Sequence, residues 1–258
     1  MTEKYETKPG VRLPKPEDAR PKRFYETVSV EPTETGFAVR LDGRPVKTPA
    51  KMPLEVPTEG LAKLIAAEWD VQGERIDAPS MPTTRLCFVA LDRMGESLEA
   101  TVAEVTRYAA TDLLCFRALD PAELVAAQAA AWDPLLKWAD ETLGAHFVPA
   151  TGVLPVDQDP IALQRVMAKA GEQDKWRLTA LAHTTAVCGS AILGLALLEG
   201  EIDGEQAFAL SSVDEAFQAS QWGEDSEAAE RLALLKGCLL YTSPSPRDLS
   251  TSRMPSSA

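Results

Sequence analysis

Histidine, cysteine and the common catalytic signatures are what this sequence has least of. It has two histidines, His146 and His183. Neither lies at the spacing of metal ligands from the other or from a cysteine. The patterns GxxxxGKS/T, GxGxxG, HExxH and GxSxG do not occur, so phosphate-binding loops, zinc proteases and hydrolase nucleophiles have no support. We therefore expect no catalytic residue, no cofactor and no metal site, and we interpret His183 as a hydrogen-bonded core residue.

Disulfide frameworks and targeting segments are also missing. The four cysteines, at positions 87, 115, 188 and 238, lie far apart and form no CxxC pair, which is typical of thiols kept reduced inside a cell. Residues 1–22 mix acids, lysines and prolines without an apolar centre, unlike a secretory signal or an acid-poor transit peptide. We expect a flexible arm over residues 1–22 and a cytoplasmic protein.

Positive charge is in short supply as well. Lysine and arginine together number 26 against 39 acidic residues, which gives a formal net charge of -13. This charge repels phosphate backbones and anionic lipid, so nucleic acid and membrane surfaces are excluded as expected partners. The composition, 45% hydrophobic and 25% charged over 258 residues, is that of a globular protein with a sizeable core.

The first half of the chain mixes strand and helix patterns. Residues 23–57 alternate apolar and polar positions around two turn signals, which predicts a small antiparallel β unit. A repeat of three to four residues predicts a helix over 58–72 with Thr58 as its N-cap. RLCFVALDRM, residues 85–94, favours a helix, and the apolar run 112–118 has the length of a strand that could return to the sheet.

The second half is helical in pattern, with Gly, Pro and Asp breaks. The fold class expected is α+β, a small N-terminal β/α domain followed by an all-helical domain. The predicted divisions are a flexible arm (1–22), the α+β domain (23–119), the helical domain (120–240) and a disordered tail (241–258) of non-native composition.

One uncharged stretch of 21 residues, 178–198, is long enough for a membrane span. It contains His183, three threonines and Ser190, and no other segment shares its character. The small residues Ala186, Ser190 and Gly194 form a ridge that suits close packing of a buried helix. We favour that buried helix and expect no stable membrane insertion, and a membrane-anchored scaffold is the alternative.

A helix over 210–222 would present two faces. Leu210, Val213 and Phe217 form an apolar stripe, whereas Glu215, Gln218 and Trp222 fall on nearly the opposite side. Gly223 is expected to end this helix in a left-handed turn.

Several stretches together resemble the ATP12-type assembly chaperones of the F-type ATP synthase. They occur in the family's order between residues 23 and 236: LDGRPVKTP, LAKLIAAEWDVQ, MPTTRL, TDLLCFRA, WDPLLKWADETLG, CGSAILGLALLEG and DEAFQASQWGED. The resemblance implies a C-terminal orthogonal helical bundle, no catalysis and one protein client, the free α subunit of the ATP synthase head. It also implies the bacterial cytoplasm, and we expect a monomer.

The resemblance places the family's sensitive segment on the second face of the 210–222 helix. Glu215, Gln218 and Trp222 are therefore the predicted partner-binding residues, because a tryptophan beside a carboxylate and an amide is typical of interface hot spots. The alternative is structural, with Trp222 packed between helix layers and Glu215 bonded to a neighbouring helix. A different alternative for function is a small-molecule enzyme that uses His183 in an acidic cleft between the domains.

Overall fold

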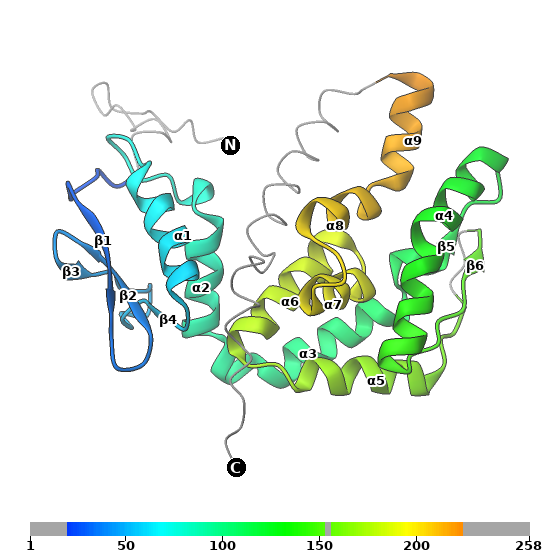
Figure 1. Ribbon diagram of the computed structural model, residues 1–258, viewed down its shortest axis with the longest axis horizontal. Helices are drawn as coiled ribbons and strands as arrows, with labels where there is room; N and C mark the ends of the chain where they lie inside the picture. Colours follow the sequence, from blue (N-terminus) through cyan, green and yellow to red (C-terminus); the bar gives the residue numbers. More distant parts are fainter. Residues whose placement is uncertain (1–19, 153–155, 224–258) are drawn as a thin grey trace, which may run out of the picture.

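The computed structural model describes residues 20–152 and 156–223, in which a small antiparallel sheet is followed by a series of helices (Figure 1). The expected tail over 241–258 and most of the expected arm lie outside the described residues. Buried apolar side chains form two clusters, one between the sheet and the first helices and one among the later helices. The mixed α and β character expected from the sequence is confirmed.

The sheet comprises strands β1 (Val28–Pro32), β2 (Phe37–Leu41), β3 (Arg44–Pro45) and β4 (Glu55–Val56). Strand β1 pairs with β2 along its whole length, from Val28 opposite Leu41 to Pro32 opposite Phe37. Strands β3 and β4 share the other edge of β2. Helix α1 (Glu59–Asp70) covers the sheet and buries Ala62, Ile65 and Trp69 against it, and the Thr58 hydroxyl accepts from the Leu61 N–H at 3.3 Å as the predicted N-cap.

A buried carboxylate connects α1 to the next helix. After the short 3-10 turn η2 (Ala78–Ser80), helix α2 (Pro82–Asp92) begins without any cap from its own Met81. Its free N–H groups are satisfied by Glu68 of α1, which accepts from Thr83 N at 2.7 Å, Thr84 N at 2.8 Å and Thr84 Oγ1 at 2.7 Å. A negative charge at a helix N-terminus is favourable, so Glu68 fixes the packing of α2 on α1.

Helix α3 (Met94–Ala110) belongs with the later helices. Its buried side chains, among them Val102, Val105 and Ala109, lie in the second cluster and pack against α5 and α6. The division between the two cores therefore falls at Arg93–Met94, ahead of the predicted boundary at residues 119–120. Periodicity in the sequence does not say which core an amphipathic helix joins.

The segment after α3 does not return to the first sheet, so that prediction is wrong. It forms a 3-10 turn, η3 (Leu113–Cys115), and a short strand, β5 (Phe116–Arg117), which pairs in parallel with β6 (Ala150–Thr151). Asp112 holds the segment against the helices instead, because its carboxylate accepts from the Ile192 N–H at 3.1 Å.

The remaining elements are helical. They are α4 (Ala122–Trp138), the π turn η4 (Ala139–Leu143), α5 (Pro160–Gly171), α6 (Lys175–Cys188), α7 (Ala191–Glu199), α8 (Gly204–Ser211) and α9 (Val213–Trp222).

The uncharged stretch 178–198 is two helices and not the single buried helix predicted from its composition. Gly189 adopts a left-handed conformation, with φ 65°, and ends α6, and Ser190 caps α7 through the Leu193 N–H at 3.0 Å. Gly194 lets the two helices meet closely, since a Cβ there would lie 2.7 Å from the Thr185 hydroxyl. Within residues 20–152 and 156–223, no helix is long and apolar enough to cross a membrane.

A buried carboxyl, that of Asp112, lies at the start of α7. It is inaccessible to solvent, and its oxygens accept from the Leu114 and Ile192 N–H groups at 3.1 Å each. Burial raises the pKa of Asp112 from 3.8 to about 6, although the hydrogen bond from Ser190 and those from backbone N–H groups oppose the shift.

Because the pKa of Asp112 is raised in the folded state, the stability of the protein is expected to depend on pH. A carboxyl whose pKa is higher in the folded state stabilises the fold fully below pH 4 and loses that contribution as the pH rises through 6. We expect the wild-type protein to lose about 2 kcal/mol of unfolding free energy between pH 4 and pH 7 relative to Asp112→Asn, which does not titrate. Urea unfolding of both proteins at the two pH values measures this; a pH-independent difference contradicts it.

Candidate functional site

Helix α9, which carries the predicted partner-binding residues, is attached to the rest of the protein at its first turn. Gln128 of α4 is buried; its amide nitrogen donates to Asp214 Oδ1 at 2.7 Å, and its amide oxygen accepts from Ala118 N at 2.8 Å. One turn along α4, the buried Trp132 donates through Nε1 to the Leu210 carbonyl at 2.8 Å. In Figure 1, α9 lies beside α4 and extends beyond α8 at one end of the helices.

The helix predicted over 210–222 is interrupted at Ser212, so Leu210 lies on α8 and the rest of the apolar stripe on α9. This stripe is only partly covered. Leu210 and Val213 pack against the second core as half-buried side chains, while Phe217, one turn further, is half-buried outside that cluster. None of the α9 side chains described, from Val213 to Gln221, is fully buried. Among the described side chains of α9, those after Phe217 are therefore more exposed than those at its attachment.

The structure places two of the three predicted residues. Glu215 is half-buried and Gln218 is exposed on α9. Trp222 closes the helix, but its side chain lies outside the described residues. Gly223 ends α9 as predicted, yet with φ 88° and ψ 163° it is not in the left-handed helical region, so that part of the prediction is wrong. Open space surrounds Gly223, since an added Cβ would meet nothing within 4 Å.

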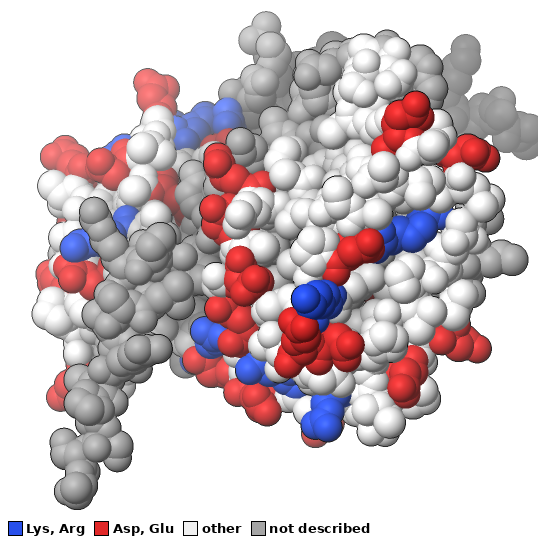
Figure 2. All heavy atoms as spheres, turned by 45° about the vertical axis from the view of Figure 1, so that its right-hand side comes forward, with Lys and Arg blue, Asp and Glu red and all other residues white. Residues whose placement is uncertain are grey.

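The surface around α4 and α9 carries charges of both signs. In Figure 2, which brings this side of the molecule forward, acidic and basic side chains adjoin one another in small groups, with uncharged areas between the groups. One ion pair joins Arg117 of β5 to Asp133 of α4 at 2.7 Å. The Arg117 guanidinium also lies 5.3 Å from the centroid of the Trp132 ring. Such a mixed polar and apolar surface is typical of protein interfaces.

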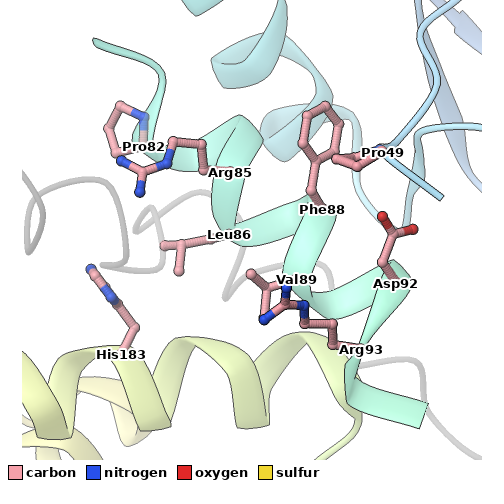
Figure 3. A pocket seen from close by; sticks show the side chains of 9 residues that line it. All are labelled: Pro49, Pro82, Arg85, Leu86, Phe88, Val89, Asp92, Arg93 and His183. Carbon is pink, nitrogen blue, oxygen red and sulfur yellow. The ribbon is translucent and has the colours of Figure 1, made fainter. Parts of the chain in front are cut away.

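A pocket of about 490 Å³ lies between the two cores (Figure 3). One wall is α2 and the Pro49 loop, and His183 of α6 faces them. The lining residues are Pro49, Pro82, Arg85, Leu86, Phe88, Val89, Asp92, Arg93 and His183.

This pocket is not the acidic cleft of the enzyme alternative. Its one carboxylate, Asp92, is engaged by the Thr48 hydroxyl and by the Ala50 N–H at 3.0 Å, and its other charged groups are two arginines. His183 is also not the hydrogen-bonded residue predicted: its Nε2 is buried without a hydrogen-bond partner among the described residues. Burial, together with the charge of Arg85, lowers the pKa of His183.

Neither a metal site nor a reactive thiol is found among the described residues. No group of three or more His, Cys, Asp or Glu side chains within them could hold a metal ion. Burial raises the pKa values of the Cys87, Cys115 and Cys188 thiols to about 12, so these sulfurs stay protonated at neutral pH.

Sequence reasoning missed three of these features for one reason. Glu68 and Asp112 act on helices that are distant from them along the chain, and the pocket of Arg85 and Arg93 exists only because α6 packs opposite α2. The signal available for Glu68 was an acid on the buried stripe of α1, beside Trp69, where a charge demands a partner.

Comparisons with known proteins agree with this architecture. The family model described as "ATP12 chaperone protein" matches residues 22–140. Atp12 from Paracoccus denitrificans is 43% identical, with a TM-score of 0.79 over 86% of this chain and 95% of that one. The Atu1473 protein of Agrobacterium tumefaciens is 42% identical, with a TM-score of 0.81 over 86% and 84% of the two chains. The mitochondrial protein atp12 of Schizosaccharomyces pombe is 26% identical over 238 residues, 88% of this chain and 81% of the relative.

Fold and relatives together define the class of protein: a chaperone of ATP synthase assembly, whose client is an ATP synthase subunit. The chain belongs to the ATP12 chaperone family. The resemblance drawn from its sequence motifs is thereby confirmed.

Proposed function

We propose that the client is the free α subunit of the ATP synthase head, held through the α9 face formed by Glu215, Gln218 and Trp222. The observation that carries this proposal is the position of α9. The helix is anchored at Asp214 by Gln128, and its Gln218, Ser220 and Gln221 side chains are exposed. An open helix face that combines apolar and hydrogen-bonding groups suits a protein client.

The chaperone acts by covering surface and needs no catalysis. A free α subunit exposes apolar surface that β subunits cover in the finished head, and such surface drives aggregation. Reversible binding lowers the concentration of the exposed species. The β subunit then displaces the chaperone because it buries the same surface more extensively, so no nucleotide hydrolysis by the chaperone is required.

We place this activity in the bacterial cytoplasm, with the chaperone as a monomer that binds one α subunit. The net charge of -13 favours a client patch that is basic and keeps the free chaperone soluble. The orthogonal arrangement of the helices implied by the family resemblance would give the bundle a rigid end on which α9 is carried.

Co-expression with the α and β subunits of the same organism tests the proposal. Purification of the full chain is expected to recover α in a one-to-one complex, and added β is expected to release it. A chaperone variant with Arg165→Ala is a control for handling, because Arg165 is exposed on α5 and lies outside the proposed client face. Recovery of β without α, or chaperone retained in the assembled head, would contradict the proposal.

A further inference from the structure

The pocket between the two cores concentrates positive charge in an otherwise acidic protein. Arg85 and Arg93 lie on α2 and at its C-cap, and both side chains are exposed. Neither forms an ion pair with any described residue, while most arginines elsewhere in the described chain do. Asp92 is hydrogen-bonded by neutral groups of the 48–50 loop and forms no ion pair with either arginine, so the pocket offers two unpaired guanidinium groups beside one carboxylate.

The wall between the two arginines is apolar. Leu86, Phe88 and Val89 line it from α2, and Pro49 and Pro82 close its sides, while His183 faces it from α6 (Figure 3). Eight residues separate Arg85 from Arg93, which corresponds to about 12 Å along a helix axis. An extended peptide advances about 3.3 Å per residue, so residues i and i+4 of such a peptide span the same distance and point to the same side.

We infer that this pocket is a second client-binding site, which takes an extended segment with a carboxylate at each end and apolar side chains between them. The inference rests on the proposed function, because it gives the client of α9 a further contact. Each carboxylate meets a guanidinium, a pairing that forms two parallel hydrogen bonds. The apolar side chains cover Leu86 and Val89, which a free inorganic anion would leave in water.

A pocket of about 490 Å³ has room for a few side chains and not for a folded domain. The pocket therefore suits a loop or a chain terminus of the client. That segment would bind in the pocket while the α9 face binds the folded part of the same client. Two contacts on one client raise its effective concentration at each, so modest affinity in the pocket contributes strongly to the whole complex.

The test compares R85E/R93E with Arg165→Glu. Arg165 is an exposed arginine on α5 that forms no ion pair with the described residues. Arg165→Glu therefore makes the same charge change as each of the two pocket substitutions, but at a site outside the pocket. We expect the double variant to recover at least 10-fold less α subunit than wild type and Arg165→Glu to recover the same amount. If charge reversal unfolds α2, R85Q/R93Q removes the same charges with neutral side chains.

A synthetic peptide separates this inference from the proposed function. The probe is a capped five-residue peptide with glutamate at both ends and leucine, valine and leucine between them; its counterpart carries glutamine at both ends. Calorimetry is expected to give binding of the glutamate peptide to wild type, at least 10-fold weaker binding to R85E/R93E, and weaker binding of the glutamine peptide.

Each outcome decides one of the two claims. Peptide binding that needs the arginines, with no recovery of α by wild type, supports the pocket and contradicts the α-subunit client. Recovery of α by R85E/R93E at the wild-type level, with both peptides equally weak, overturns the pocket and leaves α9 as the contact. Equal binding of the two peptides, or full displacement of the glutamate peptide by equimolar inorganic phosphate, also overturns it, because the pocket then recognises only apolar surface or any anion.

Discussion

Replacing Glu68 by alanine is expected to lower the unfolding free energy by about 4 kcal/mol, the largest effect on stability that we expect from a single substitution in this protein. The carboxylate accepts three hydrogen bonds, of 2.7 to 2.8 Å, from Thr83 and Thr84. Its removal leaves two buried N–H groups at the start of α2 without an acceptor, and Met81 supplies no substitute cap. Urea unfolding followed by circular dichroism measures the loss.

Two controls identify the cause of that loss. Glu68→Gln keeps one acceptor oxygen and the side-chain volume, so we expect it to cost about half as much. Glu59→Ala removes an acid from the same helix, but its ion pair with Lys63 is exposed, so we expect a change below about 0.5 kcal/mol. A loss at Glu68→Ala no larger than at Glu59→Ala would mean that water replaces the carboxylate at α2.

Glu215→Lys is expected to reduce binding of the α subunit by at least about 30-fold, which corresponds to about 2 kcal/mol. Glu215 is half-buried on the proposed client face, one turn before the exposed Gln218. Charge reversal places a cation against a client patch that the proposal requires to be basic, so repulsion replaces attraction. Titration of labelled chaperone with purified α subunit measures the dissociation constant.

The same variant distinguishes a partner surface from a structural role. If α9 binds the client, the thermal midpoint of Glu215→Lys stays close to that of wild type while binding falls. Glu205→Lys makes the same charge change at an exposed position on α8 and is expected to leave binding within about 3-fold. If Glu215→Lys lowers both the thermal midpoint and the affinity for the α subunit, the result favours the packing alternative, in which Glu215 supports a neighbouring helix.

The gap between sequence and structure is clearest at the uncharged stretch 178–198. Its composition suited a single buried helix, and the local signals at Gly189 and Ser190 were present but weak against 21 uncharged residues. The contact at Gly194 packs α7 closely on α6, and α7 is buried on every side among its neighbours, so it can be apolar all round. Burial of that kind depends on the partner helix, which a single stretch of sequence does not contain.

The sequence by itself determined the β unit, the N-cap at Thr58, the helical second half, the family and the helix that ends at Gly223. These follow from periodicity, turn residues and motif order, all of which act over a few residues. The tertiary structure alone decided that α3 joins the later helices, that Glu68 and Asp112 cap helices remote from them, and that Arg85 and Arg93 share a pocket with His183. Those features depend on distances between segments far apart in the chain, and only packing of the two cores sets such distances.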